Sequence, residues 1–253
     1  MKLILRFRSI LYYNSRMENL IAGARNLSLE LNSKQMEQLQ TFYEELVDWN
    51  QRMNLTAITD YEGVQLKHFL DSLTLTLALP SRRRDLRIID VGTGAGIPGL
   101  PLKILLIDIK LVLLEATAKK VTFLRHIVDK LELQNVEIVV GRAEEVAHQD
   151  KYRERFNVAL ARGVAELATL VELTLPFCAI GGSFIAQKKE PLDAELNQAG
   201  KAISVLGGKL REVKKIELEE FPDERRLIII DKISLTPNQY PRRPGMPAKK
   251  PLA

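Results

Sequence analysis

The sequence predicts an α/β protein of the Rossmann-like class: a seven-stranded mixed sheet ends in an antiparallel hairpin and follows an N-terminal helical extension. Three observations support this prediction. Residues 87–101, RIIDVGTGAGIPGLP, run from an apolar strand through a glycine-rich turn into a helix start. Beyond them, short apolar runs alternate with helical patterns, which is typical of a parallel sheet covered on both faces. The last two apolar runs have only a short turn between them, so they should pair antiparallel.

Two helices are expected before the glycine-rich turn. Residues 32–50 place apolar side chains at three- and four-residue steps, and Asn32 with Gln35 forms a variant of the capping box at the start. Residues 60–79 carry a second apolar stripe, which ends at Pro80. These helices form the predicted extension.

The sheet and its covering helices follow in order. The five expected parallel strands are residues 87–91, 110–115, 136–140, 156–161 and 183–187. The helices expected between them are residues 97–107, 118–131, 165–177 and 192–206. The expected hairpin consists of residues 209–219 and 225–233.

Composition sets limits on function. The net charge of +5 points toward a polyanionic partner, although a merely basic protein would have the same charge. The single cysteine, Cys178, lies in an apolar run and is interpreted as a small buried hydrophobe in a reducing cytoplasm. The three histidines and the cysteine have no metal-ligand spacing, and no apolar run is long enough to span a membrane. We therefore expect neither a metal nor a membrane partner.

The glycine-rich turn admits two interpretations. Residues 94–99 match the dinucleotide fingerprint GxGxxG, and Glu115 lies at a suitable distance to hold a ribose, so a nicotinamide-dependent oxidoreductase is one alternative. The sequence DVGTGAG, with an acid just before the glycines, is instead the first motif of S-adenosylmethionine (SAM)-dependent methyltransferases of the Rossmann-like class. The carboxylate of Asp90, expected beside the turn, favours a cationic ligand over a pyrophosphate. The terminal hairpin and the helical extension also favour the methyltransferase.

The composition and the motifs divide the chain into four segments. Residues 1–31 are expected to be a leader that is disordered or upstream of the true start, so removal of residues 1–16 should leave folding and activity intact. Residues 32–80 form the helical extension, and residues 81–235 the SAM-binding methyltransferase domain. Residues 236–253 are basic and rich in proline, so we expect an extended tail.

Several separated motifs resemble the RsmG (GidB) family of bacterial small-subunit rRNA methyltransferases. The motifs are DVGTGAGIPGLPL, LLEATAKKVTFLR, GRAEE, ARGVAEL, NLT at 54–56, HFLDS at 68–72 and YPRRPGMPAKKPL near the end. The resemblance runs from about residue 30 to the end of the chain. It implies transfer of a methyl group from SAM to N7 of a guanine in 16S rRNA, as free RNA or within the small ribosomal subunit. We expect a cytoplasmic enzyme that is a monomer. A SAM-dependent methyltransferase that acts on another RNA or on a small molecule stays open as an alternative.

Carried over residue by residue, the resemblance implies a cofactor site at the strand ends. Its residues would be Gly92, Ile97, Glu115, Ala116, Thr117, Ala143, Glu144 and Arg162. Simpler roles stay open for three of them: a helix cap for Glu115, a helix-dipole contact for Glu144, and a surface ion pair with Glu166 for Arg162. Arg162, at the expected crevice, is also the residue predicted to position the reactants, since guanine N7 carries no proton and the reaction needs no general base.

RNA contacts are expected from cations around the crevice and in the tail. The candidates are Lys67, His68, Arg142, Lys188, Lys189, Arg242, Arg243, Lys249 and Lys250. Each of these alone is more often a solvated surface charge, and the turn that carries Lys67, His68 and Asp71 is equally open to a purely salt-bridging role. Where many relatives have lysine followed by glycine after the fifth strand, this chain has Gln187-Lys188-Lys189-Glu190, which leaves the role of Lys188 open.

Overall fold

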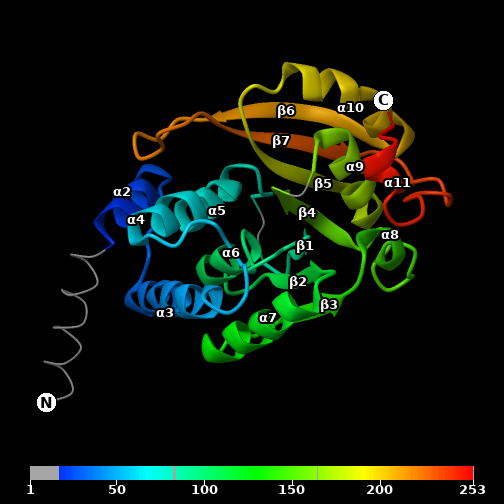
Figure 1. The fold of residues 1–253 in the computed structure, drawn as a ribbon. Helices are drawn as coiled ribbons and strands as arrows, with labels where there is room; N and C mark the ends of the chain where they lie inside the picture. Colours follow the sequence, from blue (N-terminus) through cyan, green and yellow to red (C-terminus); the bar gives the residue numbers. More distant parts are fainter. Residues whose placement is uncertain (1–16, 82–83, 164, 253) are drawn as a thin grey trace, which may run out of the picture.

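A computed structural model of the chain describes residues 17–81, 84–163 and 165–252, and within them the strands form one sheet (Figure 1). The strand order is β3-β2-β1-β4-β5-β7-β6, and β7 runs antiparallel to both of its neighbours. The strands are β1 (Arg87–Val91), β2 (Lys110–Glu115), β3 (Val136–Val140), β4 (Phe156–Arg162), β5 (Cys178–Lys189), β6 (Gly208–Ile216) and β7 (Arg225–Lys232). The predicted mixed sheet with its terminal hairpin is confirmed.

Helices cover both faces of the sheet (Figure 1). Those on one face, all contributing to a single core cluster, are α2 (Glu18–Asn26), α3 (Ser33–Asn50), α6 (Gly99–Leu105), α7 (Ala118–Lys130) and the irregular helix of residues 61–77. On the other face lie α9 (Leu167–Thr174), with the 3₁₀ turn η3 (Leu175–Phe177), and α10 (Asp193–Val205). Two short helices, α8 (Ala143–Val146) and α11 (Met246–Lys249), lie near the carboxyl ends of the strands.

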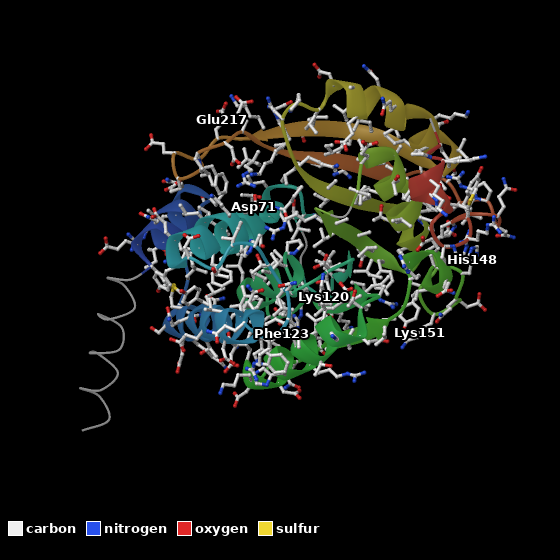
Figure 2. All side chains as sticks on the ribbon, in the orientation of Figure 1. Asp71, Lys120, Phe123, His148, Lys151 and Glu217 are labelled. Atoms are coloured by element: carbon white, nitrogen blue, oxygen red, sulfur yellow. The ribbon has the colours of Figure 1, made fainter. Side chains whose placement is uncertain are left out.

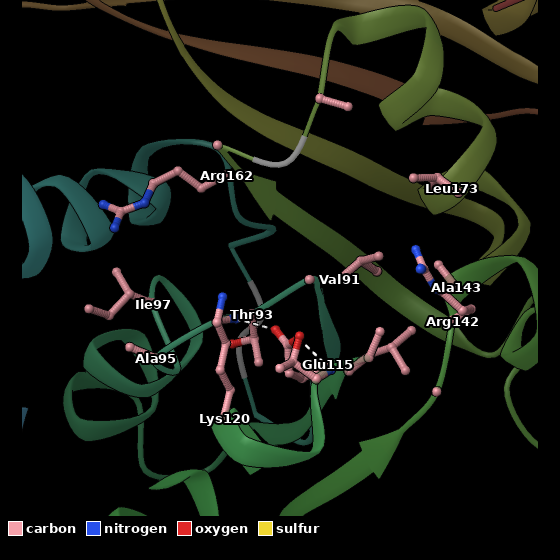
Figure 3. Close-up of a pocket in the computed structure, with 18 of the residues that line it drawn as sticks. Val91, Thr93, Ala95, Ile97, Glu115, Lys120, Arg142, Ala143, Arg162 and Leu173 are labelled. Carbon is pink, nitrogen blue, oxygen red and sulfur yellow. Dashed lines mark hydrogen bonds between the residues drawn. The ribbon is translucent and has the colours of Figure 1, made fainter. Parts of the chain in front are cut away.

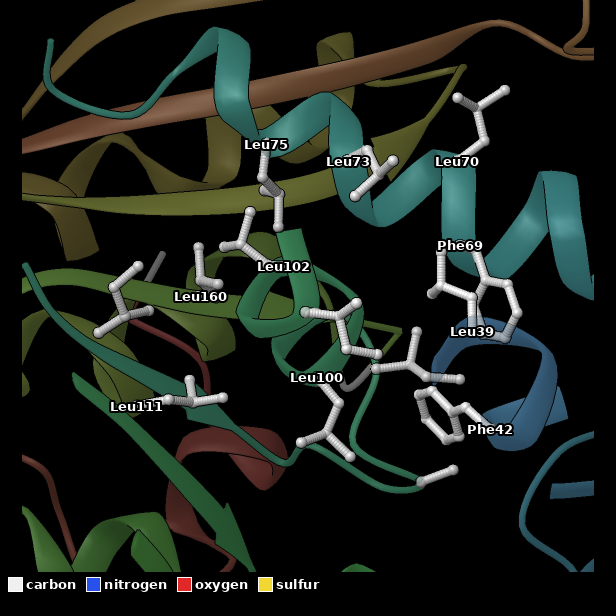
Figure 4. Packing of buried hydrophobic residues seen from close by; sticks show 14 of the residues in the cluster. Leu39, Phe42, Phe69, Leu70, Leu73, Leu75, Leu100, Leu102, Leu111 and Leu160 are labelled. Carbon is white, nitrogen blue, oxygen red and sulfur yellow. The ribbon is translucent and has the colours of Figure 1, made fainter. Parts of the chain in front are cut away.

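The strands divide their side chains between two cores. Along β1, Ile88 belongs to the core under α6 and α7, and Ile89 belongs to the core under α9 and α10. This alternation follows from the two-residue period of a strand and explains why the strands are apolar throughout. Figure 4 shows the first core, where Phe42 and Phe69 of the extension pack beside Leu100. The extension therefore shares one core with the sheet.

The helical extension begins earlier than the sequence suggested. Helix α2 lies within the segment expected to be a leader, and Met17 and Leu20 have no exposed surface. The prediction of a leader as far as residue 31 is thus wrong for residues 17–31, because the side chains at three-residue steps on α2 pack into the core. The part of that prediction that concerns residues 1–16 lies outside the described residues. The capping box of Asn32 and Gln35 is present at the start of α3.

The second helix of the extension is irregular. It begins at Asp60, whose side chain accepts from the Gly63 N–H. It continues through α4 (Tyr61–Val64), a π-helical stretch η1 (Gln65–Leu70), α5 (Asp71–Leu73) and a 3₁₀ turn η2 (Thr74–Leu77). Helical stretches with π geometry occur frequently at functional sites. Here the π-helical stretch carries Lys67 and His68, and Asp71 follows it directly.

Candidate functional site

A cavity of about 590 Å³ lies at the carboxyl ends of β1, β2, β3 and β4. It is at the point where the strand order reverses, between β1 and β4, which is where open α/β sheets bind their ligands. Figure 3 shows the glycine-rich turn and Glu115 on one side of this cavity and Ala143, Arg142 and Leu173 at one end of it. Arg162 lies at the other end, with its guanidinium directed toward the helical extension.

The glycine-rich turn forms the floor of the cavity. Gly92, Gly94 and Gly96 have φ angles of 70°, 61° and 85°, a region that side chains rarely adopt. A Cβ atom on Gly94 would meet no atom within 4 Å, so the backbone here borders open space. The turn therefore lets a ligand approach the main chain directly.

Asp90 does not line the cavity, which corrects the expectation that its carboxylate would face a cationic ligand. It is fully buried, and its Oδ2 accepts from the Thr93 hydroxyl at 2.6 Å and from the Gly99 N–H at 2.9 Å. Burial raises the pKa of Asp90 to about 6, against the opposing effect of these two hydrogen bonds. Asp90 thus ties both ends of the glycine-rich turn together from behind.

Glu115 lies at the end of β2 and lines the cavity. Its Oε2 accepts from the Gly94 N–H at 3.0 Å, and its Oε1 accepts from the Thr117 N–H at 2.8 Å. Because Thr117 is the N-cap of α7, the helix-capping role and the cavity-facing role of Glu115 occur together. Each carboxylate oxygen retains a lone pair with which it can accept from a ligand hydroxyl.

The far end of the cavity is closed by the C-terminal tail. Glu144, in the first turn of α8, accepts from the Gly245 N–H at 3.0 Å, and Pro247 and Ala248 line the cavity. Arg242 donates to both carboxylate oxygens of Glu172, which has no exposed surface. Figure 2 shows His148 beside α8, and its Nε2 lies 2.8 Å from the Pro241 carbonyl oxygen. The tail is therefore packed against α8 and α9, and the expectation of a merely extended tail is wrong.

Arg162 ends β4 and joins the sheet to the helical extension. Its Nη1 donates to the Lys67 carbonyl at 2.9 Å and to Asp71 Oδ2 at 3.0 Å. Its Nη2 lies 3.2 Å from Nδ1 of His68, whose Nε2 contacts the Thr56 hydroxyl at 2.8 Å. The ion pair with Glu166 that was the simpler alternative does not form; the partner is Asp71. The turn at 67–71 is salt-bridging, and its His68 also lines the cavity.

His68 remains uncharged at neutral pH. Burial, and secondarily the adjacent guanidinium of Arg162, lowers the pKa of His68 to about 4. A neutral imidazole can accept at Nδ1 from Arg162, whereas an imidazolium would repel it. His68 therefore supports Arg162 and is not a surface cation for RNA.

The predicted cofactor residues converge, and the predicted RNA cations do not. All eight of the former line the first cavity: Gly92, Ile97, Glu115, Ala116, Thr117, Ala143, Glu144 and Arg162. Of the latter, Lys188, Lys189 and Arg242 are engaged with Glu195, Asp223 and Glu172, respectively. The exposed ones are Arg142, Arg243, Lys249 and Lys250, and Lys67 is half-buried. Within the described part of the chain, these five form no salt bridge and remain candidates for phosphate contact.

Sequence reasoning missed part of the cavity wall. Lys120, Thr169 and Leu173 line it from helices, and Leu55 and Thr56 line it from the loop before the irregular helix. The NLT motif was a usable signal for the last two. The helix positions gave none, because they fall in ordinary amphipathic patterns.

Three expected absences concern the described residues. No group of histidine, cysteine or carboxylate side chains there is arranged to hold a metal ion. No helix there is long and apolar enough to cross a membrane. Cys178 is fully buried, and burial raises the pKa of its thiol to about 12, so the thiol is not a nucleophile.

Comparison with known proteins identifies close relatives. The family model GidB, described as rRNA small subunit methyltransferase G, matches residues 35–228. A protein named "Ribosomal RNA small subunit methyltransferase G" from Dehalococcoides mccartyi is 52% identical over 236 residues, covering 93% of this chain and 100% of that one. A protein of the same name from Clostridium novyi is 45% identical, covering 91% of this chain and 94% of the relative.

Solved structures share the fold. A SAM-dependent methyltransferase from Aquifex aeolicus is 15% identical with a TM-score of 0.50, covering 67% of this chain and 93% of that chain. A mutant of MtNAS in complex with S-adenosylmethionine is 16% identical with a TM-score of 0.52, covering 86% of this chain and 78% of that chain. The architecture is that of the Rossmann-like class I SAM-dependent methyltransferases.

Proposed function

The chain belongs to the GidB family of small-subunit rRNA methyltransferases, and on that premise we propose that its central cavity binds SAM for methylation of guanine N7 in 16S rRNA. The observation that carries this proposal is the cavity itself, which joins a glycine-rich turn, a strand-end carboxylate and Arg162 at the switch point of the sheet. Family membership also favours the methyltransferase over the nicotinamide-dependent alternative.

The residues of the cavity fit the parts of SAM. The open backbone at Gly94 leaves room for the methionine part of SAM. Glu115 can accept hydrogen bonds from the two ribose hydroxyls of SAM. Ala143 and Leu173 offer apolar contact at the end closed by the tail, where an adenine ring would be held. When bound, SAM supplies a methyl group on a positively charged sulfur.

The reaction requires no removal of a proton from guanine, because N7 carries a lone pair and no proton. The N7 lone pair of guanine forms the new carbon–nitrogen bond as the methyl–sulfur bond breaks, and the electron pair of that bond stays on sulfur. The cavity therefore needs positioning groups in place of a general base. Arg162 suits that task, because its guanidinium is held by Asp71, His68 and the Lys67 carbonyl.

The substrate is proposed to be rRNA, free or within a small-subunit particle, and the enzyme to act as a cytoplasmic monomer. Five cations that form no salt bridge with another described residue surround the cavity or extend along the tail, namely Lys67, Arg142, Arg243, Lys249 and Lys250. They are the proposed contacts to phosphate.

The test is to map N7-methylguanosine in 16S rRNA from cells that lack the protein. We expect one site to lose its methyl group and to regain it when purified protein and SAM are added to the isolated rRNA or particles. An unaltered methylation pattern would defeat the proposal.

A further inference from the structure

A second cavity, of about 340 Å³, adjoins the cofactor cavity. His68, Arg162 and Gly163 line both cavities, so a group held in one is a neighbour of a group held in the other. The rest of its wall comes from the end of β5, the start of β7 and the irregular helix. Since β4 and β5 are parallel neighbours, both cavities open at the same edge of the sheet.

Three buried polar atoms of this wall have no hydrogen bond among the described residues: Gln187 Oε1, Arg225 Nε and Arg225 Nη2. Arg225 Nε lies 2.8 Å from Asp223 Oδ1 in an ion pair, which leaves Gln187 Oε1 and Arg225 Nη2 without a partner among the described residues. The amide of Gln187 is oriented, because its Nε2 donates to the Asp71 carbonyl at 2.6 Å. The Arg225 side chain is 8% exposed; its Nη1 lies 3.5 Å from Asp71 Oδ1, and its guanidinium lies 5.1 Å from the ring centre of Phe221. Buried polar atoms are rarely left unpaired in folded proteins, so this acceptor and this donor point to a ligand.

The pair of atoms discriminates between ligand classes. A phosphate carries acceptors only, so it would satisfy Arg225 and leave Gln187 unpaired. Guanine presents an N1–H donor next to its O6 acceptor, and adenine presents the reverse arrangement at the same two positions. A guanine edge therefore matches an acceptor on Gln187 and a donor on Arg225.

Building on the proposed function, we propose that this second cavity holds the target guanine, flipped out of the RNA stack, with Gln187 Oε1 accepting from N1–H and Arg225 Nη2 donating to O6. This grip leaves N7 free on the side of Arg162 and the cofactor cavity. Extrusion of a target base into a pocket is the usual way in which enzymes modify bases within structured nucleic acid.

The experiment measures single-turnover methyl transfer to rRNA whose mapped target is guanosine or 1-methylguanosine. For the wild type, the N1 methyl group should lower the rate roughly 10- to 100-fold, the loss expected for one buried hydrogen bond. Gln187→Leu should lose about as much on guanosine and should no longer distinguish the two bases. Both proteins should bind SAM with the same Kd by calorimetry, which shows that the first cavity is intact.

Controls separate this inference from its alternatives. Arg211→Gln, an exposed site on β6, should behave as the wild type. Lys67→Gln should weaken RNA binding and its salt dependence and still discriminate between the two bases. If Gln187→Leu binds SAM normally and keeps the discrimination, the base contact is refuted; if only the lysine variant has an effect, the cavity is a phosphate site. Failure of the wild type to methylate rRNA at all would instead refute the proposed function.

Discussion

Arg162 is the residue at which the cofactor cavity, the second cavity and the helical extension meet. Its guanidinium is mostly buried and is held by Asp71 and His68 from the extension. An arginine held by several fixed acceptors loses little freedom when it binds a further group, so it is suited to positioning a reactant. Its chemistry therefore depends on residues that are far from it in the sequence.

Replacing Arg162 should separate chemistry from folding. We expect Arg162→Gln to lower single-turnover methyl transfer by roughly 100-fold, because misplacement of the reactants by about 1 Å has an effect of that size. The circular dichroism spectrum should be unchanged, and Asp71 retains Arg225 as a neighbour at 3.5 Å. Arg211→Gln is the matched surface control. Near-normal turnover by the Arg162 variant would rule out its positioning role.

His68 makes stability depend on pH. Its pKa is about 4 in the folded protein and about 6.5 when unfolded, so the unfolded chain takes up a proton first as the pH falls. Stability is therefore lost from about pH 6.5 down to pH 4. The loss at this site between pH 7 and pH 5 is about 2 kcal/mol.

This pH dependence can be assigned to His68 by comparing variants. Asp90, whose pKa is raised to about 6, acts in the opposite direction, since its folded form binds the proton more readily. We therefore expect the difference in free energy of unfolding between wild type and His68→Gln to shrink by about 2 kcal/mol on going from pH 7 to pH 5. Urea unfolding at the two pH values measures this. A constant difference would show that folding does not lower the pKa of His68.

At the residue scale, the sequence predicted well which residues line one cavity, and it predicted their charged partners poorly. Gly92 follows β1 and Glu115 ends the adjacent parallel strand β2, so their convergence is a consequence of topology. Asp90 was misassigned because adjacency in the sequence does not reveal which face of a strand a side chain occupies beside a turn. The pairing of Arg162 with Asp71, 91 positions apart, depends on docking of the extension, which no local pattern encodes.

At the element scale, the C-terminal tail is part of the cavity wall. Glu172 on α9 is fully buried, and Arg242 neutralises it. Removing one partner of a buried ion pair leaves an uncompensated charge, at a cost of about 3–5 kcal/mol. The attachment of the tail to α9 thus depends strongly on one residue pair.

Loss of the contact between the tail and α9 should weaken SAM binding. We expect Arg242→Gln to raise the Kd for SAM by roughly tenfold or more, because Gly245, Pro247 and Ala248 would no longer close the cavity. Calorimetry measures this, with Arg243→Gln, an exposed neighbour, as control. If the Arg242 variant binds SAM as the wild type does, the tail does not close the cavity in solution.

The tail should also contribute charge to RNA binding. Deletion of residues 237–253 removes the exposed cations Arg243, Lys249 and Lys250, so RNA binding should weaken and its dependence on salt should become less steep. Binding to small-subunit rRNA at several salt concentrations measures the slope. An unchanged slope would reject a phosphate contact by the tail.

Element boundaries were predicted best where the sheet is regular. Strands β1 to β3 match their predicted ranges, since apolar runs flanked by turn residues mark buried strands clearly. Strand β5 is longer than predicted, because its glycine and serine residues at 181–183 obscure the apolar run. The tail was misjudged because proline-rich composition indicates a lack of regular structure but does not exclude packing against a preformed surface.

At the scale of the whole molecule, the extension and the sheet contribute walls to both cavities, and the tail contributes a wall to the first. Helix α2 takes part indirectly. A Cβ on its Gly23 would clash with a methyl carbon of Leu70, so α2 is packed tightly against the π-helical stretch that carries His68. The first helix of the described chain therefore supports the position of Arg162 through two layers of contacts.

This arrangement predicts different effects for two N-terminal truncations. A chain that begins at residue 32 lacks Met17, Leu20 and Ala24, which are buried, and each large apolar side chain removed from a core costs about 2–5 kcal/mol. We expect its thermal midpoint to fall by more than 10 °C, since each 1 kcal/mol shifts the midpoint of a domain this size by about 2–4 °C. Methyl transfer should fall more than SAM binding, because the π-helical stretch supports Arg162 and contributes little to the cofactor cavity. A chain that begins at Met17 keeps these contacts and should match the full-length protein in both measurements; equal behaviour of the two truncations would show that α2 supports neither the core nor the site.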